Sequence, residues 1–133
     1  MKESTKEFLE LAEDDLRISK EIYRIKEYRA SCFYSQQATE KFLKAFLVEK
    51  NVFDPKKHRT HNLLLLLNEC IKIDKDFEEL RKYNIGRISA YIVITRYDIS
   101  SLKNITQEDA KEAIEIAEKV REFVLKKLSS DFR

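Results

Sequence analysis

The sequence contains almost none of the residues that make tight turns. Its 133 residues include one glycine and one proline, and tryptophan is absent. This scarcity argues against folds that depend on many tight turns and favours long helices. Charged residues, by contrast, make up 38% of the chain, which suits helices with solvated faces. The composition therefore predicts an all-α protein.

Long apolar runs are missing as well. No stretch approaches the roughly 18 uninterrupted apolar residues of a membrane span, and the N-terminal stretch MKESTKEFLELAEDD has no apolar signal core. The net charge is only +2, from 26 basic and 24 acidic side chains, which gives no reason to expect strong, indiscriminate binding to nucleic acid or membranes. We expect a cytoplasmic protein that does not contact a membrane.

Residues that hold metals or cofactors are also scarce. Cys32 and Cys70 are too few for a disulfide scaffold and lie in apolar helical patterns, so we expect buried free thiols. His58 and His61 form one H-x-x-H pair without a spaced pair of cysteines, which is a poor metal signature. A single glycine excludes a Gly-rich phosphate loop, and no serine lies in a nucleophile motif. We expect no metal and no cofactor.

Hydrophobic residues recur at helical spacing over most of the chain. The pattern predicts five helices, at about residues 5–25, 30–49, 60–71, 76–96 and 106–128. Gly86 marks a possible break in the fourth, at residues 84–86. Thr106 is a good N-cap for the last helix. No linker divides the chain, so we expect residues 1–133 to form a single domain.

The third predicted helix contains five consecutive leucines, in HNLLLLLNECIKI. This run suits a short buried helix better than a strand, because it contains no turn residues. Its expected core face consists of Leu63, Leu64, Leu67, Cys70 and Ile71.

The second predicted helix, around SCFYSQQATEKFLKAFL, has two different faces. Its expected core face consists of Tyr34, Ala38, Phe42, Ala45 and Phe46. The other face carries an aromatic residue among polar ones, and we call it the polar strip: Phe33, Gln37, Glu40, Lys41 and Lys44.

Two interpretations of the polar strip follow from the sequence. In the first, Phe33 packs under a neighbouring loop and the charges are solvated or paired within the helix, as Glu40 with Lys44 would be. In the second, the strip faces a second subunit or a ligand. The interface residues would then be Phe33, Gln37 and Lys44.

The order of the motifs resembles a known family. FYSQQATEKFLKAFL is followed by a loop, then by HNLLLLL, and then by TRYD before the last helix. This order resembles the small stand-alone prokaryotic form of HEPN domains, and the resemblance covers nearly the whole chain. Its most specific residues are Gln37, Glu40 and Lys41 in the second helix, His61 opening the third, and Arg96, Tyr97 and Asp98 ending the fourth.

The resemblance implies an up-and-down antiparallel bundle of four main helices plus a short helix. It also implies a homodimer that works with a minimal nucleotidyltransferase, as in toxin–antitoxin pairs. The seven residues that carry the resemblance would then bind a nucleotide or RNA.

Many members of that family are metal-independent RNases, with a motif of an arginine followed by four to six residues and a histidine. In that chemistry, arginine holds phosphate and histidine moves the proton of a ribose 2′-OH. The motif is absent here, because Arg59 lies too close to His61 and His58 has no arginine nearer upstream than Arg29. An RNase would need Arg96 and His61 as catalytic residues brought together by folding alone.

Each candidate also has a purely structural interpretation. His61, next to Asn62 at a helix start, is well placed to hydrogen-bond the loop backbone. Arg96 can instead lie near the last carbonyls of its helix and pair with Asp98, with Tyr97 inside the bundle. The basic residues 56–59 either contact RNA phosphates or form a solvated loop.

The leading hypothesis is a dimeric HEPN-like binding module that works with a nucleotidyltransferase. One alternative is a metal-independent RNase toxin with a non-standard site at His61 and Arg96. The other is a structural dimer without a ligand, in which the polar strip is only a subunit contact.

Overall fold

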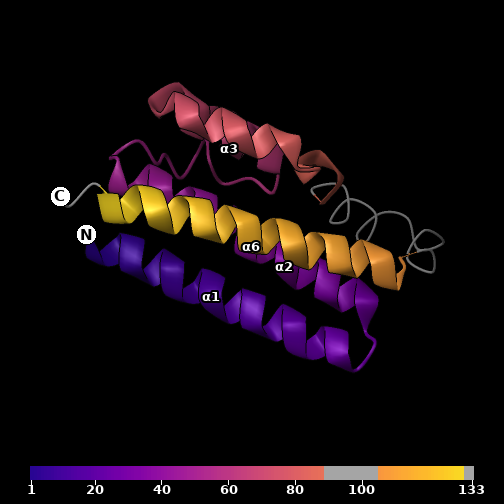
Figure 1. Ribbon diagram of the computed structural model, residues 1–133. Helices are drawn as coiled ribbons and strands as arrows, with labels where there is room; N and C mark the ends of the chain where they lie inside the picture. The colour runs from indigo at the N-terminus through magenta and orange to yellow at the C-terminus, as the bar shows by residue number, and fades with distance from the viewer. Residues whose placement is uncertain (89–104, 131–133) are drawn as a thin grey trace.

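The helical periodicity of the sequence corresponds to helices in the structure. The computed structural model describes residues 1–88 and 105–130, and within these ranges it contains no strand (Figure 1). Residues 85–88 are helical. The other helices are α1 (Glu3–Arg24), α2 (Tyr28–Glu49), α3 (Leu63–Ile73), the 3₁₀ helix η1 (Lys75–Lys82) and α6 (Gln107–Ser130). The prediction of an all-α bundle is confirmed.

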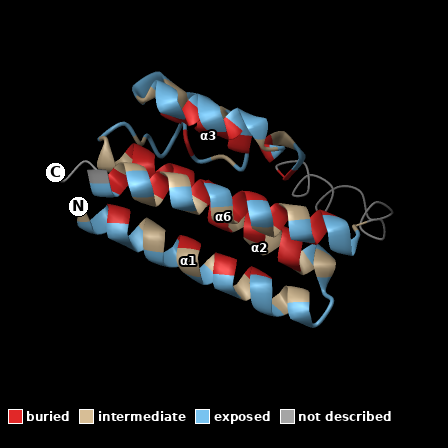
Figure 2. Ribbon diagram, in the orientation of Figure 1, coloured by how far each residue is buried: buried red, intermediate tan, exposed pale blue. Residues whose placement is uncertain are grey.

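Three helices pack around α2. The chain turns sharply after α1, where Lys26 has a φ of 66°, and α2 then runs antiparallel to α1. Both α6 and α3 also lie along α2 (Figure 1). As a result, none of residues 31–47 is exposed, and α2 is buried on most of its surface (Figure 2).

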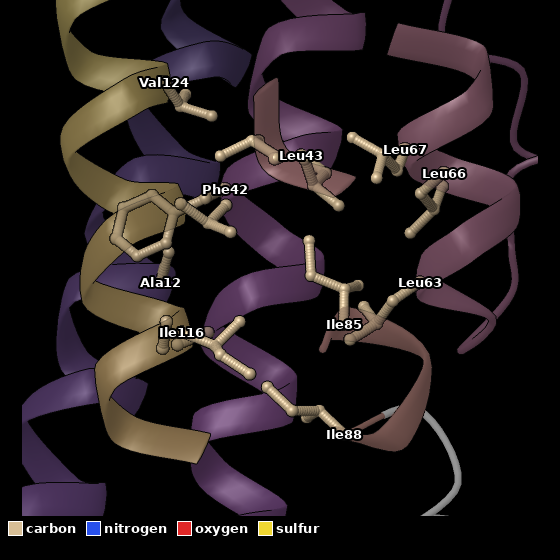
Figure 3. Close-up of a cluster of buried hydrophobic side chains, with 14 of the residues drawn as sticks. Ala12, Phe42, Leu43, Leu63, Leu66, Leu67, Ile85, Ile88, Ile116 and Val124 are labelled. Carbon is tan, nitrogen blue, oxygen red and sulfur yellow. The ribbon is translucent and has the colours of Figure 1, made fainter. Parts of the chain in front are cut away.

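Aromatic and aliphatic side chains from α1, α2, α3, η1, residues 85–88 and α6 form the core. The ring of Phe77 on η1 lies 4.4 Å from that of Phe46 on α2 and 4.8 Å from that of Phe123 on α6, between ring centroids. Ile85 and Ile88 join the same core from the helical residues 85–88 (Figure 3). Each large apolar side chain buried in this way stabilises the fold by about 1.5–3 kcal/mol.

The bounds of three predicted helices are correct to within two residues. These are the helices predicted at residues 5–25, 30–49 and 106–128. The last begins after Thr106, whose hydroxyl accepts a hydrogen bond from the backbone N–H of Asp109 at 3.2 Å, while the Asp109 carboxylate accepts one from the Thr106 N–H at 2.9 Å. This reciprocal pair satisfies two backbone donors at the helix start, as in a capping box.

The predicted register of the third helix was wrong in part. The helix begins at Leu63 because the Asn62 side chain caps it, accepting a hydrogen bond from the Leu65 N–H at 3.2 Å. Leu66 is buried where Leu64 was expected, and Leu64 is 42% exposed. A run of five leucines is apolar in every direction, so it carries no information about which face turns inward. The full buried face is Leu63, Leu66, Leu67 and Cys70.

The fourth predicted helix, over residues 76–96, was wrong as a single element. Its first part is η1, a 3₁₀ helix, in which Phe77 and Leu80 share one face because side chains three residues apart eclipse in this geometry. Tyr83 then adopts an extended conformation, with φ −89° and ψ 155°. The helix is therefore interrupted at Tyr83 and Asn84, which overlaps the possible break predicted at residues 84–86. Residues 89–96 lie outside the described residues.

Both cysteines are buried free thiols, as predicted. Burial raises the pKa of the Cys32 thiol to about 12, and burial raises that of Cys70 as well. Since the thiolate is the reactive form, neither side chain is a nucleophile near neutral pH. No helix among the described residues is long and apolar enough to cross a membrane.

Candidate functional site

The loop between α2 and α3, residues 50–62, returns along α2. It leaves the end of α2 through hydrogen bonds from the N–H groups of Val52 and Phe53 to the Leu47 carbonyl. The Phe53 ring then packs against Phe8 of α1, with 5.7 Å between the ring centroids. At the far end of the loop, the carbonyl of His61 accepts a hydrogen bond from α2. The loop thus places His61 beside the middle of α2.

His61 is joined to α2 by a buried carboxylate. Its Nδ1 lies 2.7 Å from Oε1 of Glu40, and Nζ of Lys44 donates to Oε2 of the same carboxylate at 3.0 Å. Glu40 is 4% exposed and Lys44 is 8% exposed, whereas 44% of the His61 side chain is exposed. One carboxylate therefore connects an internal ammonium group with an imidazole at the surface.

Gln36 holds the backbone of His61 in place. Its side chain is fully buried, and Nε2 donates to the His61 carbonyl at 3.2 Å. Its Oε1 accepts a hydrogen bond from Nε2 of Gln37 at 2.8 Å. Sequence reasoning missed Gln36. The only available signal was an amide side chain one turn before Glu40, and its role depends on the path of the loop.

The polar strip separates into buried and partly exposed residues. Glu40 and Lys44 pair with each other, as the first interpretation of the strip expected. Their burial was not expected. Phe33 is partly exposed and contacts the Tyr34 ring edge-on, with 5.4 Å between the ring centroids. Lys41 pairs with Asp15 of α1. The strip is therefore not one continuous exposed face, because the loop and α1 engage parts of it.

The core face predicted for this helix is largely correct. The exception is Tyr34, which is only partly buried and lies beside Phe33. The buried members are Ala38, Phe42, Ala45 and Phe46.

The predicted group of Arg96, Tyr97 and Asp98 lies outside the described residues. The structure therefore brings together His61, Glu40 and Lys44, with Gln37 close by through Gln36. The relation of His61 to Arg96 stays a prediction.

The second histidine, His58, has a structural position. Its side chain is 2% exposed, and its Nδ1 accepts a hydrogen bond from the backbone N–H of Asp54 at 2.9 Å. Its Nε2 lies 3.6 Å from Oε2 of Glu69 on α3. The Phe53 ring is next to it, at 5.8 Å between centroids. His58 therefore fastens the loop that carries His61.

Glu69 is an ionic anchor for the same loop. It pairs with Lys57 at 3.1 Å and with Lys72 at 3.2 Å. Burial alone would raise the pKa of the Glu69 carboxyl, but hydrogen bonds from Lys57 and Lys72 outweigh it and hold that pKa below its usual value. Within the basic run 56–59, Lys57 and His58 thus face Glu69.

The site supports proton transfer or anion binding. A carboxylate that accepts from one imidazole nitrogen fixes the orientation of the ring, which is the arrangement that histidines use in acid–base catalysis. An exposed imidazole can also contact a phosphate oxygen when it is protonated. Within residues 1–88 and 105–130, no group of three or more His, Cys, Asp or Glu side chains could hold a metal ion.

Comparison with known proteins agrees with this architecture. The HEPN domain model matches residues 5–128. A protein of Methanocaldococcus jannaschii named "Putative toxin MJ1304" is 28% identical to the chain over 127 residues, covering 88% of this chain and 83% of that protein. No solved structure matches the chain.

Proposed function

The chain belongs to the HEPN domain family, and we propose that it is a dimeric binding module that works with a minimal nucleotidyltransferase in a toxin–antitoxin pair. The family match over residues 5–128 and the relative named as a toxin support this proposal. The observation that carries it is the hydrogen bond from His61 to Glu40, which holds an imidazole that is 44% exposed on a buried carboxylate. The chain has this site but lacks the RNase motif of the family, in which four to six residues separate an arginine from a histidine.

In this proposal the residues of the site have different roles. His61 contacts the phosphate of a nucleotide, or a nucleotidylated group on the partner, and Glu40 and Lys44 hold it in position. Arg96 binds phosphate as a fork of N–H donors, and Tyr97 stacks on a base. Gln37, Lys41 and Asp98 complete the ligand-binding group predicted from the sequence.

The homodimer would use the partly exposed end of the polar strip. Phe33 offers an aromatic ring, and Gln37 offers the amide next to it on the same helical face. Lys44 belongs to the predicted interface too, but its ammonium is bonded to Glu40 and its side chain is 8% exposed. We assign it a supporting role beneath the contact.

The toxin–antitoxin proposal is tested by growth of a bacterial host. Expression of the chain alone should slow growth, and co-expression of a minimal nucleotidyltransferase from the same genome, as the proposed partner, should restore growth. The His61→Ala variant should lose toxicity, while Lys56→Ala, in the same loop and exposed, should keep it. Circular dichroism shows whether each variant is folded. Normal growth of cells that accumulate folded wild-type protein contradicts the proposal.

A second candidate function is a metal-independent RNase, which the His61–Glu40 contact favours. The carboxylate-held imidazole of His61 would accept the proton of a ribose 2′-OH, whose oxygen attacks the adjacent phosphorus. The P–O5′ bond breaks, the departing 5′-oxygen takes a proton from water, and a cyclic 2′,3′-phosphate remains, with Arg96 on the phosphate. This function predicts RNA cleavage in the presence of a chelator that is lost in both His61→Ala and Arg96→Ala. RNA that stays intact at high protein concentration excludes it.

A further inference from the structure

A polar groove, separate from the His61 site, lies between η1 and the C-terminal half of α6. Its volume is about 670 Å³, and no residue of the polar strip or of the loop 50–62 lines it. Volumes of about 300–1,000 Å³ are typical of sites for small molecules. The groove contains four lysines and two aromatic rings: Lys75, Lys119, Lys126, Lys127, Tyr83 and Phe123.

The carboxylates in the groove are already paired with lysines. Asp76 pairs with Lys127, which also holds Asp74 at 3.0 Å. Glu79 lies 3.5 Å from Lys82, and Glu122 lies 3.8 Å from Lys119. Each acidic group that lines the groove thus has a lysine partner, and Lys127 is shared between Asp76 and Asp74.

Two lysines of the groove remain available. Lys75 and Lys126 are exposed, and neither has a carboxylate partner among residues 1–88 and 105–130. Lys127, in contrast, is already paired with two carboxylates of the protein. Its hydrogen bonds to Asp76 and Asp74 raise the pKa of its ammonium above the ordinary value, so its charge serves the fold. The lysines of the groove that pair with no carboxylate of the described residues are therefore Lys75 and Lys126.

The aromatic side chains of the groove are held by packing. Phe123 meets Phe77 edge-on at 4.8 Å between ring centroids, and Phe77 is fully buried against Phe46. Tyr83 is partly buried, in the extended residue that follows η1. Rings that lose little freedom on binding are suitable surfaces for a planar group.

We propose that this groove binds a phosphate attached to a planar ring. Lys75 and Lys126 contact the phosphate, and Tyr83 and Phe123 contact the ring. Two ammonium groups match the double charge of a phosphate monoester near neutral pH, and aromatic side chains supply the surface on which a base stacks. A free mononucleotide has both features, whereas a nucleotide of single-stranded RNA offers the same base with a singly charged phosphodiester. The site is separate from His61 and does not depend on the function proposed there.

The proposal is tested by NMR titration with adenosine 5′-monophosphate. Every titration uses the His61→Ala background, so that binding at the first site does not contribute. Resonances of Tyr83 and Phe123 should shift, and the variant Lys75→Gln/Lys126→Gln should bind about tenfold or more weakly. The matched control is Lys111→Gln, an exposed lysine of α6 outside the groove, which should bind like the parent protein.

Titrations with inorganic phosphate and with a short single-stranded RNA test the phosphate and ring contacts separately and distinguish free nucleotides from RNA. Inorganic phosphate should bind more weakly than the mononucleotide, and Tyr83→Leu should remove that difference. A short single-stranded RNA that binds more tightly assigns the groove to an RNA strand, and equal binding assigns it to free nucleotides. The proposal is overturned if neither ligand binds, if the double variant binds like the parent, or if phosphate alone binds as tightly as the mononucleotide.

Discussion

Glu40 accepts a hydrogen bond from Nδ1 of His61 at 2.7 Å, although 21 positions separate the two residues in the chain. The same carboxylate accepts a hydrogen bond from Lys44 one helical turn further along α2. Because Glu40 is almost fully buried, its charge depends on these two partners rather than on water. The buried network is thus both a structural element and the support for His61.

Removal of Glu40 should destabilise the protein strongly. The variant Glu40→Leu leaves the ammonium of Lys44 buried without its carboxylate, which typically costs about 3–5 kcal/mol. Urea denaturation measures the free energy of unfolding. The double variant Glu40→Leu/Lys44→Met removes both charges and should recover most of the loss. A double variant no more stable than Glu40→Leu would show that the pair is not an internal ion pair.

Phe33→Asp should convert the proposed dimer into a monomer. The substitution replaces the apolar ring of the proposed interface with a carboxylate, and burial of an unpaired charge opposes association. Light scattering gives the molar mass. Phe33→Leu is the matched control, because it keeps the position apolar and should keep the dimer. If Phe33→Asp has the same mass as a dimeric wild type, the contact lies elsewhere.

The neutral imidazole of His58 should carry its proton on Nε2. Its Nδ1 accepts a hydrogen bond from the Asp54 N–H, and that nitrogen cannot also hold a proton. Nε2 is then the donor that faces Glu69. The ¹⁵N chemical shifts of the imidazole ring at neutral pH distinguish the tautomers. A proton found on Nδ1 contradicts the geometry of the loop.

The free energy of unfolding should fall in acid. The backbone N–H of Lys2 donates to the Glu49 carboxylate and lowers its pKa, with a further hydrogen bond from Thr5. Burial would raise the pKa of Asp74, but its hydrogen bonds, chiefly from Lys127, outweigh that effect and lower it. The pKa of the Glu69 carboxyl is lowered in the same way, by hydrogen bonds from Lys57 and Lys72.

Such carboxyls contribute stability above their unfolded pKa of about 4, and the contribution disappears as the pH falls through the lower folded value. Urea denaturation at neutral pH and in acid measures the difference. Glu49→Gln should reduce the pH dependence, because the variant has one fewer titrating group. A free energy of unfolding that is equal at both pH values contradicts the assignment of these shifts.

Much of the fold could be predicted from the sequence, because it depends on local signals. Helical periodicity and the Thr106 cap located α1, α2 and α6. The register of α3 could not be predicted, since five adjacent leucines are equally apolar in all directions. The 3₁₀ winding of η1 was missed because Phe77 and Leu80 have a spacing that suits both helix types.

The candidate site was predictable only in part. Glu40, Lys44 and His61 were recognised, and their types suggested polar chemistry. Periodicity placed Glu40 and Lys44 on a polar face away from the core, however, because it contains no information about a loop that returns along the helix. The contribution of Gln36 was hidden for the same reason, since its partner is a backbone carbonyl of that loop.

The most direct test of the central proposal is the molar mass of the chain co-expressed with a minimal nucleotidyltransferase from the same genome, the proposed partner. Size-exclusion chromatography with light scattering should show one complex that contains both proteins and at least two copies of the 15.9 kDa chain. The RNA assay on the same sample should leave RNA intact. Elution of the chain as a 15.9 kDa monomer, separate from the nucleotidyltransferase, would contradict the account.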